Sequence, residues 1–164
     1  MSNFDQSNQV SVSKFILDNL GRHSLMAIAT VDNQNLPWVV CVNLSYDNNL
    51  NIYWKSATAA NHSKNISYNQ NVSICIFSHS SEVGDFGFYC KSYAHEVLSE
   101  DELKLAIDVK YTKKGLPTPP ASDFLDSSNR RMYCAVITEA WINDDRHMKT
   151  LVDLDELRKQ AKLI

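Results

Sequence analysis

The chain has 164 residues, of which 44% are hydrophobic and 21% are charged, so it is long enough to form one domain with a sizeable core. Its net charge of −3 lacks the basic excess of a general nucleic-acid-binding protein. No apolar run reaches membrane-spanning length, and the N-terminal residues lack the charged and apolar segments of a signal peptide. We therefore expect a single cytoplasmic domain that binds neither nucleic acid nor membranes.

The first third of the chain predicts one helix and three strands. Residues 1–9 are polar, and we expect them to be disordered. Apolar residues at helical spacing predict a helix over residues 10–20. Three segments rich in β-branched and aromatic residues, 24–31, 37–46 and 50–55, predict strands separated by short polar turns. Strands joined by such turns pair antiparallel, so we expect a meander of hairpins.

Residues 52–66 place a strand directly before a helix. We expect this helix to span residues 58–68, with Ser56 or Thr58 as its N-cap. A helix N-terminus presents free N–H groups and the positive end of the helix dipole, which together favour an anion. The polar residues of the first turns suit a phosphate, and they are His62, Ser63 and Lys64. The alternative is an ordinary strand-to-helix connection whose basic residues are solvated.

The rest of the chain continues the mixed pattern. The expected elements are strands over residues 72–78 and 86–98, a helix from a capping box at 99–102 to Lys110, a loop over 113–129, a strand over 130–142 and a helix over 153–162. Gly87 is a candidate β-bulge. Six antiparallel strands with interposed helices predict a mainly β, α+β fold, in which a six-stranded barrel carries peripheral helices.

Cysteine and histidine spacing predicts no metal site. No two cysteines have metal-ligand or redox spacing, and most histidines are scattered without acidic partners at ligand spacing. We expect the cysteines to be reduced and buried in the core. The residues concerned are Cys41, Cys75, Cys90 and Cys134, and His23, His79, His95 and His147.

Several segments together resemble the FMN-binding split barrel family, which includes pyridoxamine 5′-phosphate oxidase. They are residues 26–30, 36–41, 52–56, 62–66 followed by 71–74, and 133–141. Each segment alone is common in β proteins, so the resemblance depends on their order and spacing between residues 25 and 143. It implies a split β-barrel that forms a homodimer with FMN at the subunit interface.

The resemblance also implies cofactor-binding residues by position. The strand that borders the isoalloxazine ring would be Trp38, Val39, Val40 and Cys41, and the segment beneath the ribityl phosphate would be Trp54, Lys55 and Ser56. The phosphate clamp would be His62, Ser63 and Lys64. One further aromatic residue near the flavin would be Trp141. The family often has Ser-Arg-Lys or a similar basic pair at the clamp. Here His62 replaces one polar residue, and Lys64 is the one firmly cationic residue of the clamp.

Two functions of different classes fit these features. The first is a flavoenzyme that oxidises or reduces a small molecule by hydride exchange at the flavin. The second is a non-catalytic flavin-binding or stress-related dimer. The chain has neither a Gly-x-Gly-x-x-Gly turn nor a Gly-x-Ser-x-Gly elbow, so a dinucleotide site and a serine hydrolase have no motif behind them. Neither the substrate nor a catalytic residue follows from the sequence.

We do not expect efficient pyridoxamine 5′-phosphate oxidase activity, because that reaction needs a second phosphate site beside the flavin. Most cations outside the clamp are predicted to be solvated. The best remaining phosphate ligands are Arg130 and Arg131, but they alternate in facing at the start of a strand, so they cannot readily act together. Arg146 and His147 are interpreted as part of a charged loop. The cations outside the clamp are Lys91, Lys104, Lys110, Lys113, Lys114, Arg130, Arg131, Arg146 and Lys149.

Overall fold

The computed structural model describes residues 8–80, 84–143 and 149–163. Its helices are α1 (Gln9–Leu20), α2 (Asn61–Tyr68), α3 (Glu100–Lys110) and α4 (Leu154–Ala161). Its strands are β1 (Leu25–Val31), β2 (Pro37–Asn43), β3 (Ile52–Ala57), β4 (Asn71–Ser80), β5 (Gly84–Glu96), β6 (Arg130–Asn143) and β7 (Lys149–Leu151). Two short 3-10 turns, η1 (Thr112–Lys114) and η2 (Ala121–Phe124), occupy the segment predicted as a loop. None of the described helices is both long and apolar enough to cross a membrane.

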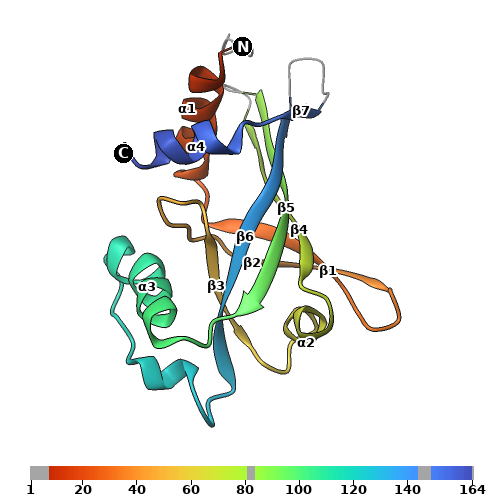
Figure 1. The fold of residues 1–164 in the computed structure, drawn as a ribbon, viewed down its shortest axis with the longest axis vertical. Helices are drawn as coiled ribbons and strands as arrows, with labels where there is room; N and C mark the ends of the chain where they lie inside the picture. The colour runs from red at the N-terminus through yellow and green to blue at the C-terminus, as the bar shows by residue number, and fades with distance from the viewer. Residues whose placement is uncertain (1–7, 81–83, 144–148, 164) are drawn as a thin grey trace.

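All seven described strands belong to one antiparallel sheet (Figure 1). The strand order is β2-β1-β4-β5-β6-β3, and β7 pairs with β6. The expected six strands therefore gain a seventh, which has three residues and is too short to show a period in the sequence. Antiparallel pairing is confirmed, but the expected meander is wrong at β3, which pairs with β6 instead of β2.

The two end strands of the sheet, β2 and β3, approach each other at one point. β2 ends earlier than expected, and a single antiparallel bridge joins Tyr46 to Ile52. Asp47 holds the intervening turn, because its carboxylate accepts hydrogen bonds from the N–H groups of Asn49 and Asn51 at 2.9 Å. Among the described residues, one isolated bridge and not a continuous ladder joins the segment after β2 to β3, so closure of the sheet into a barrel stays a prediction.

Side chains alternate between an inner and an outer face of the sheet, and each face has its own core. The inner face carries the larger core, which includes Ile28, Phe88 and Ile142, and α1 and α4 cover one end of it. The outer face carries a smaller core, in which α3 covers β3 and β6. The outer face over β2 and β4 is open in the described part of the chain, since Val39 and Phe77 are each 65% exposed.

A bulge in β6 preserves this division of faces. Lys91 of β5 pairs with Glu139 and Ser92 pairs with Ile137, so Thr138 is the extra residue. The Thr138 hydroxyl donates to the carbonyl of Lys91 at 3.1 Å. One inserted residue reverses the alternation, which keeps buried β6 side chains in the larger core on both sides of the bulge.

Gly87 is not at a bulge, contrary to prediction, and pairs in register with Phe77. A Cβ at this position would lie 2.6 Å from Tyr89 Oη and 2.8 Å from Asn143 Nδ2. We expect Gly87→Ala to lower the free energy of unfolding by about 1–3 kcal/mol, as overpacking does, in a urea denaturation experiment. Gly21→Ala is the control, because its Cβ would meet nothing closer than 3.4 Å. An equal loss in both variants would contradict this explanation.

The four cysteines are free thiols in different environments. Cys90 and Cys134 are buried as predicted, whereas Cys75 is half-buried and Cys41 is exposed. The prediction that all four lie in the core is therefore wrong for Cys41 and Cys75, because alternation in β2 and β4 places both on the open outer face.

Two expectations concern segments that the structure does not describe. Residues 1–7 lie outside the described ranges, and α1 already begins at Gln9. Arg146 and His147 also lie outside them, so the interpretation of a charged loop stays a prediction. The predicted terminal helix is confirmed as α4, with the Asp153 carboxylate accepting from the N–H groups of Asp155 and Glu156.

Candidate functional site

Helix α2 begins without a side-chain cap. Its N-cap residue is Ala60, and neither of the two predicted cap residues takes this role. The N–H groups of Asn61, His62 and Ser63 have no hydrogen-bond acceptor in the part of the chain that the structure describes. Lys64 follows in the same turn, and its side chain is exposed. Free donors, the helix dipole and a cation therefore coincide at this end of α2, as an anion site requires.

His62 ties the start of α2 to the end of β3. Its Nε2 atom lies 2.6 Å from the hydroxyl oxygen of Ser56. Burial lowers the pKa of His62, so the imidazole is neutral at pH 7. A second link fixes α2 on β1, where the buried Asn65 amide donates to the hydroxyl of Thr30 at 3.0 Å. His62 therefore positions the helix, and Lys64 is the cation of the predicted clamp.

The predicted cofactor-binding residues divide between the two faces of the sheet. Trp38, Val40, Trp54, Ser56, His62, Ser63 and Lys64 lie on the inner face or on α2, and Val39, Cys41, Lys55 and Trp141 lie on the outer face. The side chain of Trp54 is fully buried and stacks on Tyr133 with 5.6 Å between ring centroids, so only its main chain can face a ligand. A ligand that contacts both groups must lie at an edge of the sheet or between two chains.

A row of directly paired residues crosses the open outer face. From β2 to β7 the row consists of Cys41, Ala27, Cys75, Tyr89, Trp141 and Leu151. Part of it lines a shallow cavity of about 300 Å³ together with Val39. Cys41 and Leu151 are exposed and the other four residues are half-buried, and the ammonium groups of Lys91 and Lys149 lie over the rings of Trp141 and Tyr89. An apolar row with a basic border of this kind is a candidate surface for another protein to cover.

Three lysines meet near the C-terminal end of α3. The ammonium groups of Lys55 and Lys110 lie 5.8 and 5.7 Å from the ring centroid of Tyr111. Lys114 donates to the main-chain carbonyl of Leu44 at 2.6 Å. Among the described residues, no carboxylate forms an ion pair with any of these three lysines. We call Lys55, Lys110 and Lys114 the lysine cluster.

Lys110 is only 8% exposed, so the expectation that it is solvated is wrong. Burial, followed by the charges of Lys114 and Lys55, lowers its pKa to about 8. A buried ammonium without a counter-ion is costly, and a bound anion would remove that cost. Arg131, which was a candidate phosphate ligand in the sequence, is instead paired with Glu96 at 2.9 Å.

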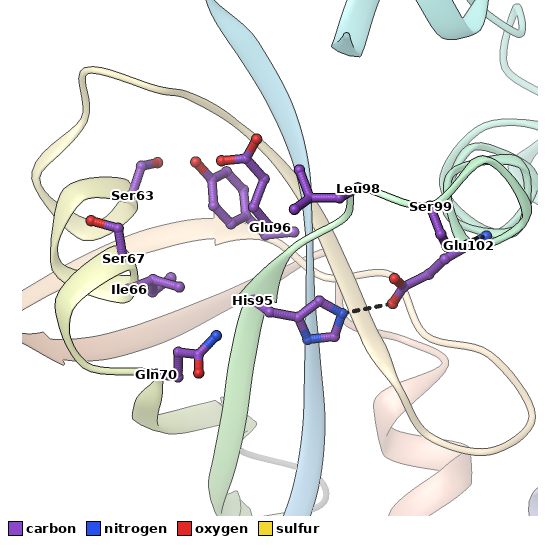
Figure 2. Close-up of a pocket in the computed structure, with 10 residues that line it drawn as sticks. Ser63, Ile66, Ser67, Gln70, His95, Glu96, Leu98, Ser99 and Glu102 are labelled. Atoms are coloured by element: carbon purple, nitrogen blue, oxygen red, sulfur yellow. Dashed lines mark hydrogen bonds and ion pairs between the residues drawn. The ribbon is translucent and has the colours of Figure 1, made fainter.

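A second cavity, of about 360 Å³, lies between α2 and the start of α3 (Figure 2). Figure 2 shows Ser63 and Ser67 of α2 on one side and Glu102 of α3 on the other. His95, at the end of β5, lies between them and has its Nε2 atom 2.8 Å from a carboxylate oxygen of Glu102. The cavity therefore has a polar wall that the sequence did not indicate.

No protein-family model matches the sequence, and no curated protein is similar to it. Solved structures are similar in fold. HutZ, the heme storage protein from Vibrio cholerae, has a TM-score of 0.66 at 16% identity, over 85% of this chain and 95% of its own. A protein from Listeria innocua, provisionally named pyridoxamine 5′-phosphate oxidase, has a TM-score of 0.62 at 17% identity, over 80% and 97%. The chain has the pyridoxamine 5′-phosphate oxidase-like split-barrel fold.

Other split-barrel structures show how far this likeness extends. A heme-binding protein from Mycobacterium smegmatis has a TM-score of 0.68 at 13% identity over 93% of this chain, which spans 60% of the length of that protein. A protein from Mesorhizobium loti, similar at 16% identity with a TM-score of 0.56, is named for FAD binding. Split barrels therefore include heme-binding and flavin-binding proteins, and these low identities establish the fold alone.

Proposed function

We propose that this split barrel is a homodimeric FMN-binding oxidoreductase that acts on a small anionic molecule. The observation that carries the proposal is the uncapped start of α2, with three free N–H groups and Lys64 in one turn. An FMN phosphate carries about −1.5 to −2 charges near pH 7 and three strong acceptor oxygens. These requirements fit the donor set at α2, and Ser56 and His62 hold that set against β3.

The open outer face supports the homodimer. If two such faces pack together, they cover the apolar row and bring Val39, Cys41 and Trp141 to the interface. Obligate interfaces typically bury roughly 2,000 Å² or more, so they need a broad, continuous surface. The apolar row provides one, because it crosses six neighbouring strands of the sheet, namely β2, β1, β4, β5, β6 and β7. The outer group of predicted cofactor residues would then lie where the two chains meet.

The lysine cluster supports an anionic substrate. A bound flavin supplies the hydride exchange, and the chain supplies binding and orientation. Lys55 immediately precedes Ser56 in β3, and alternation points Lys55 toward Tyr111 while Ser56 bonds to His62. Two candidate anion sites thus flank the end of β3. The sequence predicted no second phosphate site beside the flavin, because most cations outside the clamp were expected to be solvated. Lys110 is buried, so that reason does not hold for the lysine cluster.

We expect Lys64→Ala to weaken FMN binding by about tenfold, measured by quenching of flavin fluorescence. A charge-assisted hydrogen bond contributes about 1.5–3 kcal/mol, and the exposure of Lys64 favours the lower end of that range. Lys14→Ala is the matched control, because Lys14 is also exposed but lies on α1, at the other end of the molecule (Figure 1). Unchanged affinity in Lys64→Ala would remove Lys64 from the phosphate site.

The visible spectrum of the purified protein tests the cofactor itself. The two bands of an oxidised flavin would support the proposal, and loss of these bands on anaerobic addition of a nicotinamide cofactor would show that the flavin is reducible by hydride. Flavin bands that resist every reductant of this class would favour the non-catalytic flavin-binding dimer. A heme Soret band in place of flavin bands, with no quenching of added FMN, would overturn the cofactor assignment.

A further inference from the structure

Three potential metal ligands converge on the outer face of the sheet beneath α3. His95 of β5 and Cys134 of β6 are direct partners across the ladder, so their side chains leave the same face side by side. Glu102 reaches them from the first turn of α3, which is held by a hydrogen bond from the Glu102 N–H to the Ser99 hydroxyl. One nitrogen, one sulfur and one carboxylate oxygen from these residues all lie within 4.8 Å of one another.

These separations bracket the spacing that a tetrahedral metal ion requires. Metal bonds of about 2.0–2.3 Å to nitrogen, oxygen and sulfur place tetrahedral ligand atoms about 3.3–3.8 Å apart. The shortest pair, His95 Nε2 to Glu102 Oε1, is 2.8 Å apart, and the largest separation is 4.8 Å at most. Both His95 and Glu102 have partly exposed side chains, 29% and 28%, so small rotations bring all three atoms into range.

The sulfur side of the group is closed. Cys134 is 2% exposed and packs in the smaller core with Tyr53 and Met132, so a metal ion would reach its sulfur only from the side of His95 and Glu102. A coordinating thiol loses its proton to a bound divalent cation, and the carboxylate of Glu102 would help to balance the charge of the ion.

The fourth side of the group opens toward solvent. His95, Glu102 and Ser99 line the cavity of about 360 Å³ between α2 and α3, as Figure 2 shows for these residues. Three protein ligands with one open position are typical of metal sites that bind a water molecule or a small ligand. A thiolate and an imidazole in the set exclude Mg²⁺ and Ca²⁺, which prefer oxygen ligands.

We propose that His95, Glu102 and Cys134 bind a divalent transition-metal ion such as Zn²⁺, with one coordination position facing this cavity. Binding exchanges the Cys134 thiol proton for the metal, and that proton leaves to solvent. No oxidation or reduction takes place. None of the three ligands belongs to the start of α2 or to the lysine cluster, so metal binding does not require flavin, although Ser63 of the predicted clamp lines the same cavity.

Titration of flavin-free protein with Co²⁺ alone tests this site. We expect visible ligand-field bands of tetrahedral Co²⁺ and a near-ultraviolet thiolate-to-cobalt band, all removed by one equivalent of Zn²⁺. Cys134→Ser should abolish the thiolate band, and His95→Gln should weaken Co²⁺ affinity by at least about 10- to 100-fold. Cys41→Ser is the matched control, because that thiol is exposed on the same sheet face away from α3 and should leave both readouts unchanged.

Each outcome decides the question. Absence of a thiolate band in the wild type, or its persistence in Cys134→Ser, would overturn the site. Loss of the band in Cys41→Ser alone would assign the metal to a different thiol and would also overturn it. If Cys134→Ser does not fold by circular dichroism, the half-exposed His95→Gln decides alone, and unchanged affinity in that variant rejects the proposal.

Discussion

Replacing Val39 with glutamate should convert the proposed homodimer into a monomer. Val39 is 65% exposed in the single chain and lies on the open outer face beside the apolar row. Lys91, the lysine that lines the same cavity, is already paired with Glu139, so the new carboxylate would be buried without a counter-ion of its own at a cost of several kcal/mol. Two-fold symmetry places one such carboxylate in each chain. Light scattering at micromolar protein should give the dimer mass for the wild type and the monomer mass for Val39→Glu. The monomer should also bind FMN more weakly, because its cofactor site would lack the second chain.

Leu163→Glu is the matched control for this prediction. Leu163 is 74% exposed and follows α4, outside the sheet, so the same new charge should leave the mass unchanged. A monomer mass for the wild type would reject the homodimer. A dimer mass for Val39→Glu would place the interface on a surface other than the outer face.

Local sequence patterns predicted most helices and strands but not the way the strands pair. Alternation in β4 and the stripe in α1 are properties of short segments, so their periods are visible without the rest of the chain. The pairing of β3 with β6 depends on contacts between segments far apart in sequence, and turn signals near β3 favoured the wrong neighbour, β2. A pattern also cannot tell whether a sheet face is covered, which is why Cys41 was placed in the core.

The same limit applies to the candidate sites. The start of α2 was found because its donors are consecutive residues, although the predicted cap was wrong and His62 is buried and neutral. The lysine cluster combines β3, α3 and η1, and the proposed metal ligands combine β5, α3 and β6. No spacing rule connects such residues, because tertiary structure alone brings them together. One signal was available for the lysines, since Lys110 and Lys114 are close in sequence at the end of a predicted helix.

Replacing Lys110 with methionine should stabilise the ligand-free protein at pH 7. The pKa of Lys110 is about 8 in the folded chain, below its ordinary value of 10.5, so the folded state disfavours the charged form. The difference corresponds to about 3 kcal/mol as an upper limit, and methionine fills a similar volume without a charge. Urea denaturation should therefore show a higher free energy of unfolding for Lys110→Met. Lys104→Met is the control on the same helix, because that exposed lysine pairs with the exposed Glu100 and its loss should leave the free energy of unfolding nearly unchanged.

The pH dependence of the free energy of unfolding tests whether burying the charge of Lys110 destabilises the folded chain. Below pH 8 both the folded and the unfolded chain carry a proton on Lys110, and the penalty of burying the charge is complete. Between about pH 8 and 10.5 the unfolded chain holds more protons than the folded chain, so the wild type should gain stability as pH rises. Lys110→Met should lack this gain. An identical dependence of unfolding free energy on pH in both proteins would show that folding does not lower the pKa of Lys110.

Anion binding distinguishes a functional lysine from one that is merely buried. A bound phosphate that pairs with Lys110 would restore the favourable charged form. Phosphate added to FMN-loaded protein, in which the cofactor would occupy the start of α2, should therefore raise the unfolding temperature of the wild type beyond its general salt effect. Lys110→Met should retain only the general effect, and Lys104→Met should respond like the wild type. A variant that is more stable without ligand but no longer responds to phosphate would show the exchange of stability for binding that is expected at a functional site. Equal phosphate responses in all three proteins would remove the lysine cluster from the proposed substrate site.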